Sequence, residues 1–285
     1  MQEHLELVEC PRDAMQGWAY FIPTDQKISY LNTLLGVGFD VLDCGSFVSP
    51  KAIPQMRDTA EVLAQLDMSA TKTKLLVIVA NQRGAEEAVA FEQVSYLGFP
   101  LSLSETFQQR NTNKSIADAL RDVEALQRLC VQKNKEAVVY LSMGFGNPYG
   151  DPYSPEVVIE WTKKLADLGV KTVALADTVG VADDKTISYL FSTLIPEFPS
   201  LKIGAHFHST PNSWEEKVQS AYDAGCRRFD SAFKGIGGCP MAKDDLVGNL
   251  ATENLVAWAQ SRRVSPALDG RVFQNALLQA SGVFL

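Results

Sequence analysis

The stretch TVALADTVGVADDKTISYLFSTLIPEFPSLKIGAHFH, residues 172–208, decides the fold class. Its first and last segments, Thr172–Ala176 and Lys202–His208, are short apolar runs of the kind that form buried parallel strands. The intervening segment, Asp183–Pro196, spaces its apolar residues as an amphipathic helix does. Two parallel strands joined by a crossover helix form a β-α-β unit. This stretch therefore predicts an α/β fold.

The same alternation continues along the whole chain. Further strands are predicted at Leu5–Glu9, Phe39–Asp43, Lys74–Ala80, Gln93–Phe99, Ala137–Ser142 and Arg228–Phe233. Further helices are predicted at Thr24–Leu35, Ile53–Leu66, Gly84–Glu92, Asn113–Gln132, Pro155–Leu168, Ser213–Ala224, Thr252–Gln260 and Asp269–Ser281. Eight strand–helix units without a Pro/Gly/Ser-rich linker predict a single (β/α)8 TIM-barrel domain over residues 1–285, with an extra C-terminal helical segment. A doubly wound open sheet is the alternative, although its G-x-G-x-x-G fingerprint does not follow the first strand.

Composition excludes several classes of protein. The 285 residues include 26 Lys+Arg and 34 Asp+Glu, and the net charge of −8 argues against non-specific nucleic-acid binding. Five scattered cysteines without a C-x-x-C pair do not form a disulfide framework and suit a reducing cytosol. The start MQEHLELVEC lacks the regions of a secretory signal, and no apolar run reaches the ~20 residues of a membrane helix. We therefore expect a soluble, cytoplasmic protein.

The pair His206 and His208 is the sharpest chemical signal. Side chains alternate along a strand, so both imidazoles point to one face, at the strand end where barrel enzymes carry their sites. Asp13, after the first strand, adds a carboxylate, and this nitrogen and oxygen set favours Mg²⁺ or Mn²⁺ over a structural zinc. The residues alone leave open that one or both histidines are ordinary core or rim residues.

Other strand ends also carry polar residues. Arg12 would face an oxygen that gains charge, unless Arg12 and Asp13 form a plain solvated ion pair. The turn GIGGCP at 235–240 places Cys239 in a glycine-rich loop, which is otherwise an ordinary tight turn. Asp43 and Asp177 are either site residues or carboxylates that favour a helix N-terminus. The remaining cysteines are interpreted as small buried hydrophobes: Cys10, Cys44, Cys130 and Cys226.

Six segments in succession carry a family resemblance. They are PRDAMQ at 11–16, SFVSPK at 46–51 followed by PQM at 54–56, ADTVGV at 176–181, HFH at 206–208, GIGGCP at 235–240 and GNLATEN at 248–254. Together they resemble the 3-hydroxy-3-methylglutaryl-CoA lyases of the DRE-TIM metallolyase group, over nearly the whole chain. The resemblance implies retro-Claisen cleavage of 3-hydroxy-3-methylglutaryl-CoA, or a close branched 3-hydroxyacyl-CoA, to acetyl-CoA and acetoacetate, as in leucine degradation.

The resemblance also implies roles for individual residues. The ligands of a divalent metal, Mg²⁺ or Mn²⁺, would be Asp13, His206, His208 and Asn249. Arg12 would stabilise the enolate, and Cys239 would transfer a proton. The substrate-positioning groups would be Gln16, Asp43, Ser46 and Asp177. A homodimer through the C-terminal helices is expected, and Arg12, Lys51 and Lys234 would offset the charge of an acyl-CoA substrate.

The chain departs from the family pattern at several loops. Asp43 stands where the lyases have Glu, and Ser209-Thr210-Pro211 replaces the run of Asp-Thr and a glycine after the second histidine. Gln16 is followed by Gly17-Trp18 instead of Asn-Glu, and the spacing from Cys239 to Asn249 is one residue longer. These loops shape the substrate pocket. The alternatives are another DRE-TIM aldolase or Claisen-type enzyme, or a catalytically weakened homologue that only binds a CoA-like ligand.

Overall fold

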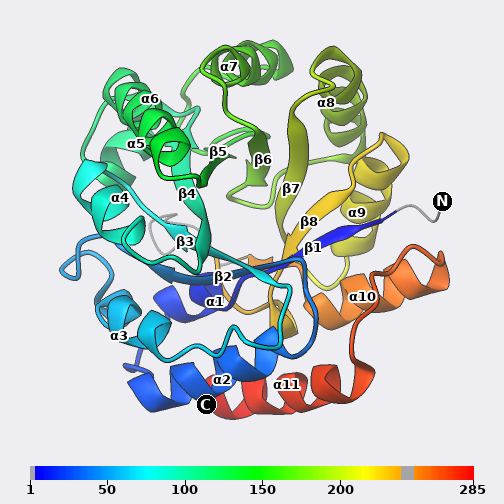
Figure 1. Cartoon of the computed structure of the whole chain (residues 1–285). Helices are drawn as coiled ribbons and strands as arrows, with labels where there is room; N and C mark the ends of the chain where they lie inside the picture. Colours follow the sequence, from blue (N-terminus) through cyan, green and yellow to red (C-terminus); the bar gives the residue numbers. More distant parts are fainter. Residues whose placement is uncertain (1–3, 239–246) are drawn as a thin grey trace.

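Eight parallel strands close into a barrel, drawn in Figure 1. The computed structural model describes residues 4–238 and 247–285, so Cys239 lies outside the described residues. The strands are β1 (Glu6–Glu9), β2 (Val41–Ser46), β3 (Lys74–Ile78), β4 (Val94–Ser102), β5 (Glu136–Ser142), β6 (Thr172–Asp177), β7 (Lys202–Ser209) and β8 (Arg228–Ser231). They follow one another around the barrel, and β6 also pairs with β7. This pairing closes the sheet, so the predicted (β/α)8 barrel is confirmed and the open sheet is wrong.

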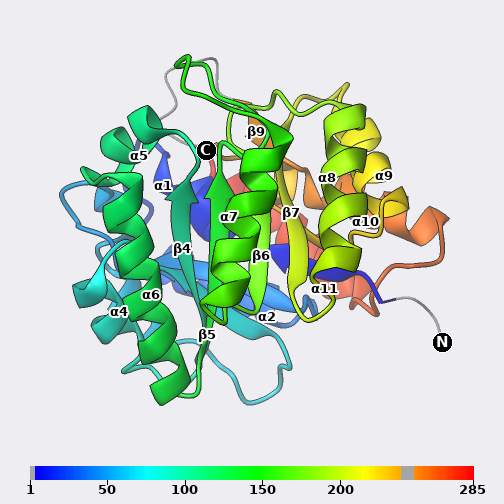
Figure 2. The same ribbon diagram turned by 90° about the horizontal axis from the view of Figure 1, so that it is seen from above.

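The helices surround the barrel, as Figure 2 shows from above. They are α1 (Pro11–Gln16), α2 (Thr24–Leu35), α3 (Thr59–Ala64), α4 (Gln82–Ala88), α5 (Glu105–Thr112), α6 (Ile116–Gln132), α7 (Pro155–Asp167), α8 (Asp184–Glu197), α9 (Trp214–Asp223), α10 (Thr252–Ser261) and α11 (Gly270–Val283), with 3-10 turns η1 (Pro54–Met56) and η2 (Phe233–Gly235). The extra C-terminal segment is α11, which packs beside α2. Within the described ranges, no helix combines the length and apolar character that a membrane span requires.

Two apolar layers follow from the alternation of strand side chains. One set of positions, with Val8, Cys10 and Tyr140 among them, fills the inside of the barrel. The other set, with Leu7 and Phe229, packs against the surrounding helices. The four described cysteines are all buried and free, which confirms their interpretation as small hydrophobes.

Several strands and helices differ from the predictions in where they end or in whether they were predicted at all. Strand β2 begins at Val41 and continues to Ser46, and β4 continues to Ser102, so both reach further toward the strand ends that hold the site. Helix α5 was not predicted, because its sequence ETFQQRNT is too polar to show a periodic apolar face. Strand β9 (Gly248–Asn249), which pairs antiparallel with β7, is too short to have any period.

Candidate active site

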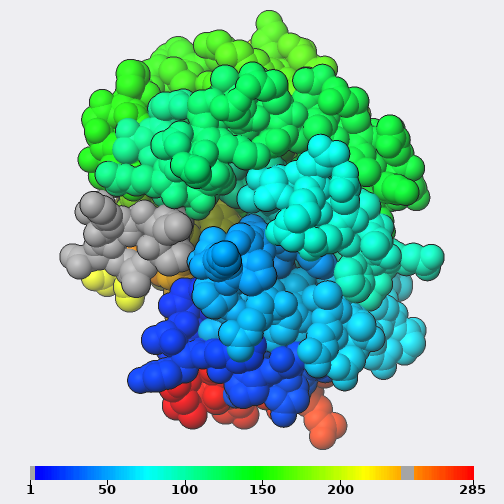
Figure 3. Space-filling view, turned by 90° about the vertical axis from the view of Figure 1, so that its left-hand side faces the viewer, coloured from blue at the N-terminus to red at the C-terminus, as the bar shows by residue number. Residues whose placement is uncertain are grey.

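A cavity of about 430 Å³ opens at the carboxyl ends of the strands. Six of the predicted site residues line it: Arg12, Asp13, Gln16, Ser46, His206 and His208. They come from opposite ends of the sequence and meet because parallel strands of a barrel end on one rim. Figure 3 shows a hollow between the blue and the green parts of the surface on one side of the molecule.

Asp13, His206 and His208 form the candidate metal centre. Their ligand atoms all lie within 4.8 Å of one another. The Nδ1 atom of His206 lies 3.1 Å from a carboxylate oxygen of Asp230, and Nδ1 of His208 lies 2.9 Å from the carbonyl oxygen of Thr178. Both rings therefore donate from Nδ1, which leaves Nε2 as the atom with a free lone pair.

The Nε2 atom of His208 supplies the test of whether a metal fits. It is buried, and among the described residues it has no hydrogen-bond partner. A buried nitrogen without a partner is costly unless something else binds it. Two imidazole nitrogens and a carboxylate, without a thiolate, suit a divalent cation that keeps open positions. The residues present therefore fit the metal that the sequence predicts.

Strand β9 brings Asn249 to this centre. Its backbone pairs with His208 of β7, and its amide nitrogen donates to Asp13 Oδ2 at 2.8 Å and to the Ile236 carbonyl oxygen at 2.9 Å. Both bonds use the nitrogen, so the carbonyl oxygen Oδ1 is the atom that could bind a cation. Gly237, at φ +113°, makes this approach possible, because a Cβ there would lie 2.4 Å from the Asn249 amide nitrogen.

The Asp13 carboxylate at the centre is kept ionised, while the two imidazoles differ in how their surroundings shift their pKa values. Burial alone would raise the pKa of Asp13, but Arg12 and the two histidines outweigh it and hold that pKa at about 2. Burial, together with neighbouring His206, lowers the pKa of His208. Burial opposes the charged form of His206 as well, but the hydrogen bond and charge of Asp230 raise its pKa. A carboxylate is thus kept ionised beside two nitrogen donors.

Arg12 is held in a fixed orientation by three side chains. Its Nη2 donates to Asp43 at 2.5 Å and its Nε donates to the same carboxylate at 3.0 Å, while Nη1 donates to Asp13 at 2.9 Å and Gln16 at 3.0 Å. These bonds use four of the five N–H groups, so one Nη2–H is left for a substrate oxygen. Burial raises the pKa of Asp43 to about 6 despite the charge of Arg12. Asp43 lies behind Arg12 and does not line the cavity.

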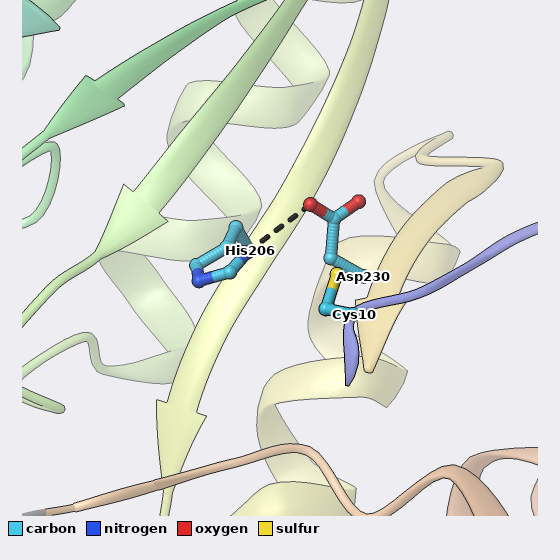
Figure 4. A group of neighbouring side chains, drawn as sticks. All are labelled: Cys10, His206 and Asp230. Carbon is cyan, nitrogen blue, oxygen red and sulfur yellow. Dashed lines mark hydrogen bonds and ion pairs between the residues drawn. The ribbon is translucent and has the colours of Figure 1, made fainter. Parts of the chain in front are cut away.

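A second group of candidate ligands, Cys10, His206 and Asp230, lies beneath the first and is drawn in Figure 4. Neither Cys10 nor Asp230 lines the cavity. Burial raises the pKa of the Cys10 thiol well above its usual value, and a protonated thiol is a poor ligand. Asp230 also accepts a hydrogen bond from Arg228, whose positive charge opposes a cation there. Only the Asp13, His206 and His208 group therefore opens toward a substrate.

Asp177 lies behind the metal centre and does not line the cavity. Its carboxylate accepts hydrogen bonds from Lys217 at 2.6 Å and from the Val181 amide at 2.8 Å, and Lys217 also donates to the His208 carbonyl oxygen at 3.0 Å. The pair thus fixes the ends of β6 and β7. Lys51 and Lys234 were expected to offset the charge of the substrate. Neither lines the cavity: Lys51 is exposed on the turn after β2, and Lys234 donates to Ser281 of α11.

The cavity has a cationic edge that was not predicted from the sequence. Arg110 and Asn111 at the end of α5, and Asn113 and Lys114 between α5 and α6, line it together with Tyr140 of β5. The guanidinium of Arg110 lies 4.5 Å from the centroid of the Tyr149 ring. The run QQRNTNK at 108–114 was the available signal, since it is polar and basic and lies in the segment between two strands.

Comparison with known proteins identifies the family. The profile of the HMGL-like family matches residues 7–277. The chain belongs to the HMGL-like family. A hydroxymethylglutaryl-CoA lyase of Bacillus subtilis is 33% identical over 86% of this chain and 81% of its own length, and a cytoplasmic 3-hydroxy-3-methylglutaryl-CoA lyase of Rattus norvegicus is 32% identical over 94% and 78%.

Solved structures of this HMGL-like family have the same fold. An HMG-CoA lyase from Acinetobacter baumannii, in complex with coenzyme A and 3-methylmalate, matches with a TM-score of 0.91 at 29% identity, over 99% of this chain and 91% of that one. The similar proteins are named as carbon–carbon lyases, so the predicted family is confirmed and the chain is a member of a lyase family.

Proposed function

We propose that this protein is a metal-dependent lyase that cleaves 3-hydroxy-3-methylglutaryl-CoA, or a close branched 3-hydroxyacyl-CoA, to acetyl-CoA and acetoacetate. The observation that carries the proposal is the buried, unpartnered Nε2 of His208 beside Asp13 and His206, at the base of a cavity that Arg12 also lines. Arg110 and Lys114 at its edge suit the anionic phosphates of coenzyme A. Relatives named for this reaction support the substrate class.

In the reaction, the C2–C3 bond breaks and its electron pair moves onto the thioester as an enolate, while the 3-hydroxyl gives its proton to solvent water and becomes the ketone of acetoacetate. Arg12 donates its remaining Nη2–H to the thioester oxygen as negative charge develops there. Asp43, Asp13 and Gln16 already fix the guanidinium, so little reorganisation is needed at that moment. Cys239, outside the described residues, donates the proton that converts the enolate to acetyl-CoA.

Asp13, His206, His208 and Asn249 would hold a divalent cation, Mg²⁺ or Mn²⁺, which would supply Lewis-acid chemistry that lowers the pKa of the substrate hydroxyl. Gln16 hydrogen-bonds both Arg12 and Asp13 and so links the two halves of the site. Ser46 lines the cavity at the end of β2, where it can contact the substrate. Asp177 keeps its proposed positioning role through Lys217.

The direct test measures acetoacetate and acetyl-CoA release after removal of metal with EDTA and addition of Mn²⁺ or Mg²⁺. We expect cleavage that requires the metal. His208→Ala should lose at least about 100-fold in kcat, because a site with three ligands binds the metal weakly. His4→Ala is the matched control, since this exposed histidine contacts Asp40 far from the cavity.

The alternatives give different outcomes in the same assay. Binding of the CoA thioester without turnover would indicate a weakened homologue that only binds ligand. Turnover of other branched 3-hydroxyacyl-CoAs alone would change the substrate but keep the reaction. No cleavage of any of these thioesters with either metal would refute the lyase proposal. The homodimer and the cytoplasmic location stay predictions.

A further inference from the structure

An arginine is buried inside the barrel, beneath the metal centre. Arg228 of β8 is 2% exposed, its Nη1 donates to Asp230 Oδ1 at 2.7 Å, and its Nε lies 3.3 Å from Glu6 of β1. Gly204 of β7 provides the space, because a Cβ there would lie 2.8 Å from Nη1 of Arg228. Arg228 thus occupies a space that Gly204 leaves open and is paired with two carboxylates. Buried arginines are rare in proteins unless they are paired in this way, so this one is part of the barrel's internal structure.

Asp230 connects this arginine to the metal centre. It is 2% exposed, and its two oxygens have different partners: Oδ1 accepts from Arg228, and Oδ2 lies 3.1 Å from Nδ1 of His206, the bond drawn in Figure 4. The ring of Tyr140 meets the His206 ring edge to face, with the centroids 5.6 Å apart. The imidazole is thus held by a hydrogen bond on one nitrogen and by packing.

We propose that Arg228 and Asp230 form a positioning pair that sets the tautomer and orientation of His206. Arg228 only donates, so it fixes Oδ1 of Asp230 and turns Oδ2 toward His206. Oδ2 then accepts the Nδ1 proton, and Nε2 presents its lone pair beside Asp13 and His208. This inference rests on the proposed function only in that the centre binds a divalent metal.

The proposed role of Asp230 predicts an unusual result for its isosteric substitution by asparagine. In Asp230→Asn, the amide oxygen remains toward Arg228, because the guanidinium cannot accept a hydrogen bond. The amide NH2 group then faces Nδ1 of His206, which must become the acceptor. The ring proton moves to Nε2 and points at the metal position. Asp230→Asn should therefore impair metal binding more than Asp230→Ala. The alanine removes the hydrogen bond that favours the Nδ1 tautomer of His206, but it does not impose the Nε2 tautomer.

Two measurements test the proposal on the whole chain. The first is the affinity for Mn²⁺ alone by titration calorimetry: we expect a loss of about 100-fold for Asp230→Asn and about 10-fold for Asp230→Ala. The second is the ¹⁵N spectrum of the metal-free protein labelled at histidine, which shows three rings only. At a pH high enough for the imidazoles to be neutral, the ring of His206, assigned with His206→Gln, should carry its proton on Nδ1 in the wild type and on Nε2 in Asp230→Asn.

The control is Asp40→Asn, which alters the only other described carboxylate partner of a histidine ring, that of His4. Asp40→Asn should keep the Mn²⁺ affinity within about twofold of the wild-type value. If an Asp230 variant does not fold, Arg228→Lys and Arg228→Met keep the accepting carboxylate and should keep the Nδ1 tautomer, but Arg228→Met, which no longer fixes the orientation of Asp230, should weaken Mn²⁺ affinity more than Arg228→Lys does.

The outcomes separate the two proposals. If the wild type binds no Mn²⁺, the metal-dependent function fails, while the tautomer spectra still decide the positioning proposal. If the wild type binds Mn²⁺ and Asp230→Asn binds it equally, or keeps the proton on Nδ1, the positioning proposal is wrong and the function stands. A purely structural role for Asp230 would make the truncation to Ala worse than the isosteric Asn.

Discussion

Glu9→Gln should make the protein more stable at high pH. Glu9, at the end of β1, is fully buried; its Oε1 accepts from the Phe233 amide at 3.0 Å, and its Oε2 accepts from the Thr252 hydroxyl at 2.5 Å. Burial raises the pKa of Glu9 to about 8, although these two hydrogen bonds oppose the shift. Glutamine has the same shape, can accept from Phe233 and donate to Thr252, and never ionises.

The sign and size of this difference in unfolding free energy follow from proton linkage. A carboxyl whose pKa is raised by folding contributes stability that is complete below its unfolded pKa, near 4.5, and is lost as the pH rises toward 8. A pKa shift from 4.5 to about 8 is about 3.5 units, and at about 1.4 kcal/mol per unit it corresponds to about 5 kcal/mol as an upper value. We therefore expect Glu9→Gln to match the wild type near pH 5 and to exceed it by about 2–4 kcal/mol at pH 8.

Urea unfolding, followed by tryptophan fluorescence at pH 5 and pH 8, measures this difference. The comparison of two variants at one pH cancels the titration of every other group. Glu61→Gln, on the exposed side of α3, is the control and should not change the pH dependence. Equal differences between wild type and Glu9→Gln at both pH values would refute the reasoning, because a neutral Glu9 would then not be required for folding.

Three further outcomes are expected. Lys217→Met should lower the free energy of unfolding by about 3–5 kcal/mol, measured in urea, because it leaves the buried Asp177 carboxylate without its cation. Gly237→Ala should weaken Mn²⁺ binding at least about 10-fold in calorimetry, because its Cβ displaces Asn249; unchanged affinity would exclude Asn249 as a ligand. Cys239→Ala should lower kcat about 100-fold while Mn²⁺ affinity stays the same, and full activity would exclude the thiol as proton donor.

The sequence predicts the barrel well because its signals are local. Helix α2 begins and ends at the predicted residues, Thr24 and Leu35, because Pro23 and Gly36 bound a clear apolar period. The strand ends were less accurate: β2 and β4 both extend three residues beyond their predicted ends, into residues with weak strand preference. Hydrogen bonding to neighbouring strands decides those positions, and no single segment contains that information.

The part of the site that depends on local sequence was predictable, and the part that depends on neighbouring strands was not. His206 and His208 share a face by strand alternation, but the partners that orient them come from β8 on one side and from the residue that follows β6 on the other. The role of Arg228 could not be predicted from the sequence. It belongs to a predicted buried strand, and the space that it occupies exists only because Gly204 of the neighbouring β7 has no side chain. The cationic edge around Arg110 was missed because its polar helix has no period.

The contact between Asp13 and Asn249 joins residues that are 236 positions apart in the chain. During synthesis, the ends of β1 and β7 emerge from the ribosome before the residue that completes the ligand set. A nascent chain therefore cannot hold the metal with all four proposed ligands until β9 is available to pair with β7. Binding by all four proposed ligands must therefore follow the synthesis of β9, and truncated chains that lack β9 should bind Mn²⁺ more weakly than the whole chain.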